Sequence, residues 1–229
     1  MAENQTVVIR APLSGVIVPL ERVPDPVFSQ KMVGDGVSID PTSVDLLAPC
    51  DGRIVQIHKA NHAVTIETPE GVEVMMHVGI DTVALKGRGF QLRTDEGTEV
   101  KAGDTLLTFN ADYVATHAKS LLTQIVITNG ERVSTYEPAT GVVKAGDDVC
   151  LELALAATAE TSDAEAGATA TSDAILVPNP TGLHARPAAV LANLAKQFNA
   201  DIRLHKGETE ANAKSVVALM GLEVGLNDK

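Results

Sequence analysis

Two histidines of this 229-residue chain stand beside residues that can make an imidazole reactive. His77 lies in GVEVMMHVGID, where Gly79 and Asp81 follow it at every second position. A nearby carboxylate can fix the tautomer of an imidazole and leave its other nitrogen free as a nucleophile. The same spacing also fits an ordinary surface histidine. The pattern therefore makes His77 a candidate nucleophile, with Asp81 and Gly79 as supporting residues.

His184 lies in a different setting, in the string NPTGLHARPA at residues 179–188. This string is expected to join a strand to a helix, which places His184 at a helix N-terminus. Unpaired backbone N–H groups and the positive end of the helix dipole favour a phosphoryl group there. Arg186 adds a cation that can hold phosphate oxygens. The alternative is a helix-capping histidine followed by a solvated arginine.

The remaining histidines carry weaker signals. His62, in NHAVTIE, is either a packed residue at a strand end or a partner of His77. Two histidines without cysteine make a weak ligand set for a metal, so we expect neither a metal nor a cofactor. His58, His117 and His205 have no neighbouring residues in a pattern that indicates chemistry. They are expected to be solvated or local structural residues.

A strand over residues 72–81 must present His77. Apolar residues recur at every second position, so one face is expected to pack on the core: Val72, Val74, Met76, Val78 and Ile80. The other face is expected to point outward, and it carries Glu73, Met75, His77, Gly79 and Asp81.

Residues 1–155 have the pattern of an all-β domain. Short apolar stretches such as RIVQI and QIVIT alternate with turns such as Asp51-Gly52 and Asn129-Gly130. Such spacing is typical of an antiparallel β-sandwich or a barrel. The motif A-P-x-x-G-x-I-V occurs at 11–18 and again at 48–55, which fits a quasi-symmetric β fold.

Residues 156–173 are rich in Ala, Thr and acidic residues and contain no large apolar side chain. We expect a flexible linker there, because such a stretch buries too little surface to offset its ordering entropy. The alternative is a short Ala-rich helix.

Residues 174–229 are expected to form an α+β unit. The pattern predicts a strand at 174–178, a helix at 185–198, a strand at 201–205 and a second helix that starts near Ser215. On the first helix, one apolar face is expected to carry Leu191, Leu194, Ala195 and Phe198.

Composition excludes several classes of protein. The formal net charge is -12, which argues against a nucleic-acid or anionic-membrane surface. No apolar run approaches the ~20 residues of a membrane span. Cys50 and Cys150 show neither a C-x-x-C motif nor a disulfide framework. These features favour a reduced, cytoplasmic protein.

Residues 174–229 resemble HPr, the histidine phosphocarrier of the bacterial phosphoenolpyruvate:sugar phosphotransferase system. NPTGLHARPA is similar to the active-site string of that family. The resemblance implies that His184 is phosphorylated and that Arg186 binds the phosphate. NAKSVVALMGLEVG resembles the region that carries the regulatory serine, here Ser215. It also implies an open-faced α+β sandwich.

Residues 1–155 resemble the glucose-type enzyme IIA domain of the same system, through strings such as APLSGVIVPLERVPDPVF, NHAVTIET and GVEVMMHVGIDTVALKG. The resemblance implies an antiparallel β-sandwich in which His77 is phosphorylated and His62 is the second active-site histidine. Ala60 replaces a hydroxyl residue that is usual in the family, and Met75 stands where an aromatic residue is common.

The order of the two domains resembles the N-terminus of multiphosphoryl transfer proteins. The chain ends at Lys229, where the HPr family would continue with a strand and a final helix. We therefore expect a truncated HPr-like domain, at best partly ordered, in which Ile202, Leu204, Val217 and Leu219 lie partly uncovered.

The two resemblances together imply a phosphotransferase component that acts as a phosphoryl carrier. Phosphate would pass from enzyme I to His184, then to His77, then to a cysteine of a membrane-associated IIB domain, and so to a sugar that enters through IIC. Added HPr would be an alternative donor. Two other hypotheses stay open: a regulatory protein that binds partners according to its phosphorylation state, and a biotinyl- or lipoyl-type carrier domain. The latter needs a modifiable lysine in an M-K-M or D-K-A context, which is absent from the sequence.

Overall fold

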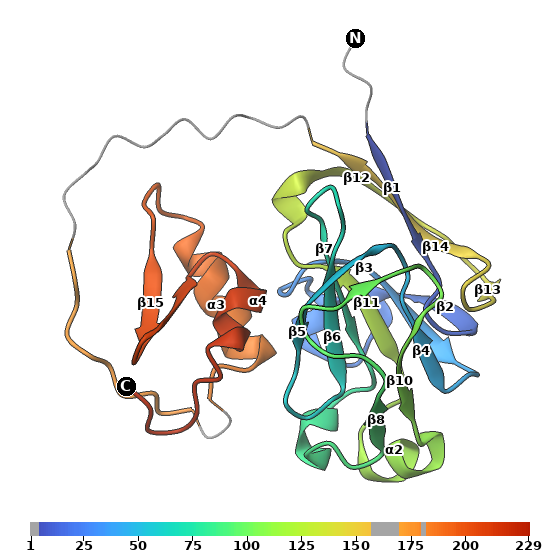
Figure 1. The fold of residues 1–229 in the computed structure, drawn as a ribbon, viewed down its shortest axis with the longest axis horizontal. Helices are drawn as coiled ribbons and strands as arrows, with labels where there is room; N and C mark the ends of the chain where they lie inside the picture. Colours follow the sequence, from blue (N-terminus) through green and yellow to red (C-terminus); the bar gives the residue numbers. More distant parts are fainter. Residues whose placement is uncertain (1–4, 157–169, 180–181) are drawn as a thin grey trace.

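A computed structural model describes residues 5–156, 170–179 and 182–229. It contains a β domain up to residue 156 and a smaller C-terminal domain after residue 170 (Figure 1). Most of the segment expected to be a linker, residues 157–169, lies outside the described residues.

Fourteen strands make up the β domain within the described residues. They are β1 (Thr6–Arg10), β2 (Gly15–Pro19), β3 (Asp35–Pro41), β4 (Asp45–Leu47), β5 (Gly52–Ile57), β6 (Ala63–Glu67), β7 (Glu73–His77), β8 (Phe90–Leu92), β9 (Glu99–Val100), β10 (Thr105–Phe109), β11 (Thr123–Ile127), β12 (Val133–Pro138), β13 (Val142–Val143) and β14 (Val149–Leu155). Two short helices accompany them, α1 (Pro26–Ser29) and α2 (Ala111–His117).

The largest sheet has eight strands in the order β13-β2-β3-β11-β7-β6-β5-β9. Two three-stranded sheets, β1-β14-β12 and β4-β10-β8, complete the β domain. The aliphatic core lies between these sheets, and it includes Ile9, Ile39, Ile66, Leu107 and Leu153. Every strand pair is antiparallel, which confirms the expected fold class of the first domain.

The two faces of β7 differ as the alternation predicts, but the second face is not open to water. Val74 and Met76 join the core between the sheets. Met75 instead belongs to a second apolar cluster, together with Val126 of the neighbouring strand β11. Met75 is only 1% exposed, so the expectation that it points outward is wrong, whereas Glu73 and His77 are half-buried and Asp81 is exposed. Residues from elsewhere in the chain cover Met75.

The C-terminal domain supplies part of that cover. It contains α3 (Ala185–Ala195), the hairpin β15 (Arg203–Lys206) and β16 (Thr209–Asn212), and α4 (Val216–Gly221). Ser215 caps α4 with its side chain, which confirms the expected helix start. No strand forms over residues 174–178, against expectation. In this segment, Val177 makes backbone hydrogen bonds with Asn227 and Asp228.

The buried face of α3 is made of alanines. Ala188, Ala189 and Ala192 are fully buried, whereas Leu194 and Phe198 are 51% and 55% exposed. The expected apolar face is therefore wrong for Leu194 and Phe198, whereas Ala195 is buried and Leu191 is half-buried against the cluster. Small side chains allow α3 to pack closely against the β domain. These alanines belong to the second cluster, together with Val27 and Phe28 of α1.

The same cluster corrects the expectation for α4. Val217 and Leu219 are buried, and Leu219 joins the cluster that contains Met75 of the β domain. Ile202 and Leu204 remain half-buried, as expected for a partly covered hairpin. Packing against the β domain thus buries Leu219, which was expected to lie partly uncovered.

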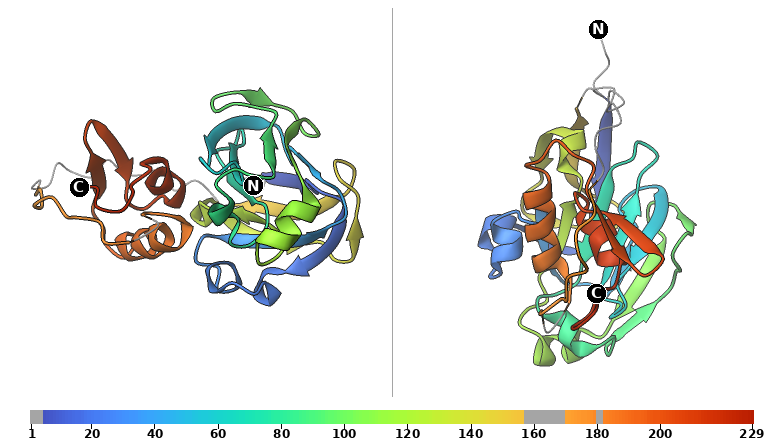
Figure 2. Two further views of the ribbon diagram at one scale, coloured as in Figure 1. Left: turned by 90° about the horizontal axis from the view of Figure 1, so that it is seen from below. Right: turned by 90° about the vertical axis from the view of Figure 1, so that its left-hand side faces the viewer.

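The C-terminal domain lies beside the β domain (Figures 1 and 2). Polar contacts accompany the apolar cluster between the two domains. The side chain of Gln56 donates to the backbone oxygen of Val217 at 3.1 Å, and Asn193 donates to that of Met32 at 3.1 Å. Lys196 lies 3.4 Å from Glu131. These contacts fix the orientation of α3 and α4 on the sheet.

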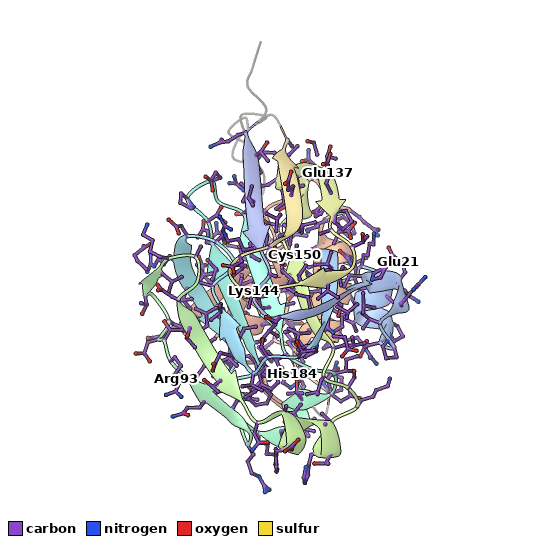
Figure 3. All side chains as sticks on the ribbon, turned by 90° about the vertical axis from the view of Figure 1, so that its right-hand side faces the viewer. Glu21, Arg93, Glu137, Lys144, Cys150 and His184 are labelled. Atoms are coloured by element: carbon purple, nitrogen blue, oxygen red, sulfur yellow. The ribbon has the colours of Figure 1, made fainter. Side chains whose placement is uncertain are left out.

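Charged side chains such as Glu21, Arg93 and Glu137 are exposed and reach the edge of the molecule in Figure 3. None of the helices in the described part of the chain is long and apolar enough to span a membrane.

The contact of Gln56 gives a direct test of the docked arrangement. Gln56→Glu would replace the amide donor with a carboxylate that faces the oxygen of Val217. Loss of a buried hydrogen bond costs about 1–3 kcal/mol, so docking should weaken about tenfold to a hundredfold. Small-angle X-ray scattering should show a larger radius of gyration for this variant.

The matched control is Gln91→Glu, which makes the same charge change at an exposed position of β8. Its scattering should equal that of the wild type. An unchanged radius of gyration for Gln56→Glu would mean that this interface does not hold the domains together.

Candidate functional site

Four imidazole rings lie in a row across the boundary between the two domains. The ring centroids are 5.5 Å apart for His184 and His58, 4.5 Å for His58 and His62, and 4.6 Å for His62 and His77. Three of these rings come from the β domain, and His184 comes from the C-terminal domain. The row therefore brings together all three histidines that the sequence singled out, together with one that it did not.

His77 ends β7 and is held in one tautomer. Its Nδ1 lies 2.9 Å from the backbone oxygen of Gly79. Because a carbonyl can only accept, Nδ1 carries the proton and Nε2 of the neutral ring keeps its lone pair. Gly79 has φ of 75°, and a Cβ there would lie 2.6 Å from Thr82. Glycine is thus required to aim this carbonyl at His77.

The orienting group of His77 is therefore the Gly79 carbonyl and not the carboxylate of Asp81. Asp81 is exposed, lies at φ of 61° and begins the short helix Thr82–Leu85. Burial lowers the pKa of His77 and so favours its neutral form, although the nearby carboxylate of Asp25 acts in the opposite direction. The ring of Phe28 packs beside it, with centroids 5.2 Å apart.

His62 lies just before β6 and is 3% exposed. Its ring meets that of His77 edge-on. Burial lowers its pKa well below the ordinary value, and the neighbouring His77 adds to this effect. Its Nδ1 has no hydrogen-bond partner among the described residues. His62 is thus a neutral ring that is packed at the start of β6 and also lies next to His77, so it has both of its expected features.

His184 occupies the N-cap position of α3, as expected. The turn before it depends on Gly182, which has φ of 68° and lies so close to Val224 that a Cβ would collide with its carbonyl oxygen. The backbone of Leu183 is bonded to the same oxygen. This turn aims the His184 ring at the β domain, where burial lowers its pKa.

Arg186 contacts the carboxylate of Asp25, a residue that no sequence pattern identifies. Its guanidinium lies 3.3 Å from Asp25 across the domain boundary. Asp25 is itself fixed, because it accepts a hydrogen bond from the backbone of Val27 at 2.8 Å and caps α1. Asp25 is also close enough to His77 to affect its pKa. The cation of Arg186 is therefore held near the row of histidines.

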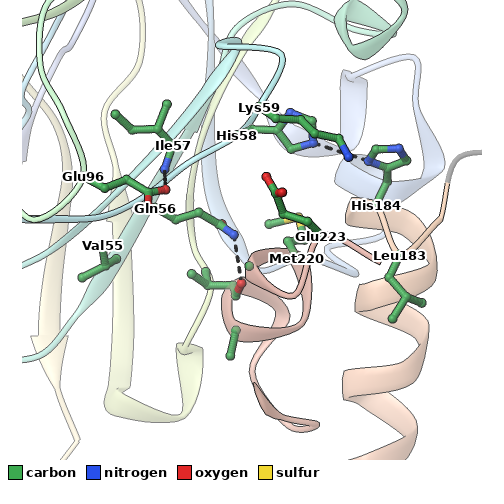
Figure 4. A pocket seen from close by; sticks show the side chains of 13 residues that line it. Val55, Gln56, Ile57, His58, Lys59, Glu96, Leu183, His184, Met220 and Glu223 are labelled. Atoms are coloured by element: carbon green, nitrogen blue, oxygen red, sulfur yellow. Dashed lines mark hydrogen bonds between the residues drawn. The ribbon is translucent and has the colours of Figure 1, made fainter. Parts of the chain in front are cut away.

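His58 corrects the expectation that it has no constellation. Its Nε2 lies 3.4 Å from Nδ1 of His184, and its ring packs on His62. A cavity of about 320 Å³ opens beside this contact, lined by residues of β5 and α4 as well as by Lys59 and His184 (Figure 4). No periodicity could reveal a contact between residues 126 positions apart.

The other candidate residues lie as follows. Ser215 is half-buried at the start of α4, where its hydroxyl accepts a hydrogen bond from Ala218. His117 stacks on Tyr113, and His205 is exposed near Glu210, so both are local residues as expected. Within the ranges that the structure describes, no three His, Cys, Asp or Glu side chains are grouped as metal ligands.

The chemistry of this row follows from its charge state. Neutral imidazoles with a free ring nitrogen are nucleophiles, and those of His77 and His184 lie at the two ends of the row. A helix N-terminus and a guanidinium lie beside them, and both stabilise negative oxygens. Such an arrangement suits the movement of an anionic group from one nitrogen to another.

Comparison with known proteins agrees with both halves of this arrangement. Residues 7–133 match the family model described as phosphoenolpyruvate-dependent sugar phosphotransferase system, EIIA 1. Residues 171–229 match the model described as PTS HPr component phosphorylation site.

Similar curated proteins include two glucose-specific EIIA components of the PTS system. The protein from Haemophilus influenzae is 47% identical over 153 residues, which cover 66% of this chain and 92% of that protein. The protein from Borreliella burgdorferi is 44% identical over 139 residues, which cover 61% of this chain and 74% of that protein.

A similar solved structure is glucose permease IIA from Mycoplasma capricolum, with a TM-score of 0.62 and 38% identity over 65% of this chain and 96% of that chain. The chain belongs to the EIIA 1 family of phosphoenolpyruvate-dependent sugar phosphotransferase systems, joined here to an HPr domain, and is a phosphocarrier of such a system.

Proposed function

We propose that this chain relays a phosphoryl group from His184 to His77 within one molecule. Enzyme I would load His184, and His77 would pass the group to a cysteine of a IIB domain for the uptake of a sugar through IIC. The observation that carries the proposal is the row of four imidazoles that links the two candidate histidines across the domain boundary. The sugar is expected to be of the glucose or N-acetylglucosamine type.

The tautomer of His77 supports its role as acceptor. Its proton is on Nδ1, bonded to Gly79, so Nε2 can attack phosphorus without first losing a proton. A neutral ring is needed for this attack, and burial lowers the pKa of His77 accordingly. His62, packed edge-on against His77, would orient the ring and contact the phosphoryl group in onward transfer.

Arg186 would bind the phosphoryl oxygens during the transfer. In the present arrangement its guanidinium is paired with Asp25 at 3.3 Å. Phosphoryl transfer depends on positioning and on stabilisation of charge on the oxygens, and a fixed guanidinium supplies both. Asp25 would position the guanidinium of Arg186, and part of this ion pair would break when Arg186 binds the phosphoryl oxygens.

A regulatory role is the second candidate, and one feature favours it. The C-terminal domain covers the surface around His77, so docking and partner binding compete for the same residues. Ser215 lies at this boundary, next to the helix α4 whose Val217 contacts Gln56. A phosphate on Ser215 would place charge against the interface and favour separation of the domains.

The assignment of His77 can be tested with single substitutions. His77→Ala should abolish labelling of the β domain by added phospho-HPr, because it removes the Nε2 that the Gly79 carbonyl leaves free and oriented. His62→Ala should keep the label and slow its transfer to a IIB domain. Mapping of the acid-labile, base-stable phosphate to peptides checks both results.

His117→Ala is the matched control for that experiment, because His117 lies outside the row. This variant should accept phosphate from phospho-HPr and transfer it to a IIB domain at the wild-type rates. Full labelling of the His77→Ala β domain would contradict the assignment of His77.

Transfer within one molecule predicts a distinct concentration dependence. The wild-type chain should move phosphate from His184 to His77 at a rate that does not change with protein concentration, because the docked domain supplies a high effective concentration. A mixture of His77→Ala chains and His184→Ala chains can transfer only between molecules. Its rate should rise in proportion to concentration, as rapid-quench measurements would show.

Equal concentration dependence in the wild type and in the mixture would show that the docked arrangement gives no intramolecular advantage.

Docking should also weaken as the pH falls. Burial, followed by the charges of His184, His77 and Lys59, lowers the pKa of His58 from 6.5 to about 4. When the domains separate, His58 regains water and its ordinary pKa, so the separated state binds the proton more readily. Docking is unaffected well above pH 6.5 and is progressively lost between pH 6.5 and 4.

Scattering at pH 7.5 and at pH 5 measures this effect, with circular dichroism as a check that both domains remain folded. The change in radius of gyration should be smaller for His58→Phe. An identical radius at both pH values in the wild type would rule out this pH dependence.

A further inference from the structure

The hydrogen bonds of His58 fix the position of its proton. The backbone N–H of Ala60 donates to its Nδ1 at 3.1 Å. A backbone N–H can only donate, so Nδ1 must accept, and the neutral ring carries its proton on Nε2. Burial lowers the pKa of this ring to about 4, so the neutral form is the one present near pH 7.

The proton of His58 then points at His184. Nε2 of His58 lies 3.4 Å from Nδ1 of His184, as the dashed line in Figure 4 shows. With the donor fixed on His58, Nδ1 of His184 must be the acceptor and must hold a lone pair. The structure thus shows His184 in the form that it takes when it carries no phosphoryl group, with a hydrogen bond donated to Nδ1.

A phosphoryl group bonded to Nδ1 does not fit between two nitrogens that are 3.4 Å apart. The rings must therefore separate slightly when His184 is phosphorylated, and the N–H of His58 then meets a phosphoryl oxygen in place of the nitrogen. Space for this shift exists in the cavity beside the contact, and the ammonium of Lys59 lies close enough to affect the pKa of both rings.

We propose that His58 is a further catalytic residue of the transfer between His184 and His77, as a hydrogen-bond donor to the phosphoryl group and then to the nitrogen that the group leaves. This inference rests on the function proposed above. His58 takes no phosphate in this role, because its Nε2 carries a proton and its Nδ1 is engaged by Ala60.

The transfer balances without any movement of protons. Because His58 and His62 lie between His184 and His77 in the row, the phosphorylated ring of His184 must first move past His58 to reach His77. The P–N bond to Nδ1 of His184 then breaks while a P–N bond to Nε2 of His77 forms. The electron pair of the broken bond stays on Nδ1 of His184, where it accepts the N–H of His58. His184 keeps its proton on Nε2, and His77 keeps its proton on Nδ1, bonded to Gly79.

Two substitutions separate donation from packing. His58→Gln keeps an N–H donor but loses the flat ring, whereas His58→Phe keeps a flat ring of similar size without a donor. A hydrogen bond to a charged group contributes about 1.5–3 kcal/mol. The single-turnover rate from His184 to His77 should therefore fall about tenfold to a hundredfold in His58→Phe, and only a few-fold in His58→Gln.

The experiment loads the 229-residue chain with phosphoenolpyruvate and enzyme I and follows transfer by rapid quench and peptide mapping. His117→Phe, outside the row, is the control and should transfer at the wild-type rate. A wild-type rate for His58→Phe, a slower rate for His58→Gln than for His58→Phe, or phosphate found on His58 would each overturn the proposal.

Ring nitrogen NMR gives a second readout that needs no phosphate. Long-range proton–nitrogen spectra at pH 7.5 should show His58 protonated on Nε2 alone and His184 unprotonated on Nδ1. A proton on Nδ1 of His58 would overturn the proposal even if transfer occurs. Failure of the wild type to transfer at all would instead contradict the proposed function, and the ring spectra would still test the bond between His58 and His184.

Discussion

Burial of imidazole rings between two domains is the constraint on which the site depends. The alanine face of α3 packs against α1 and the Met75 face of the sheet, so His62 is buried and His58 and His77 are half-buried. Loss of water lowers the pKa of each ring and keeps it neutral. Backbone groups at Ala60 and Gly79 then decide which nitrogen carries the proton. Packing and reactivity are thus linked through desolvation.

The same burial limits the access of partner proteins to His77 and His184. A surface that holds His184 against the β domain also covers His77, so neither histidine is open to a separate partner while the domains are docked. In the proposed relay, entry of phosphate at His184 and its exit from His77 would both require separation of the domains. The interface suits this cycle, because α3 contributes only alanines to the buried part of the apolar cluster, and its polar rim consists of single contacts such as Gln56 with Val217.

Much of this site could be predicted from the sequence, for reasons that are local. Alternation along β7 identified the face of His77, and the string around His184 placed it at a helix start. The roles of His58 and Asp25 could not be predicted, because their partners His184 and Arg186 lie more than 120 residues away. The buried face of α3 was missed for the same reason, since its alanines are covered by another domain and not by their own.

The most direct test of this account is the proximity of two rings in solution. Nuclear Overhauser spectra of the dilute 229-residue chain at pH 7.5 should show cross-peaks between ring protons of His58 and His184, whose centroids lie 5.5 Å apart. Nitrogen relaxation should also give both domains one common tumbling time. Absent cross-peaks, together with faster independent tumbling of residues 182–229, would contradict the docked relay.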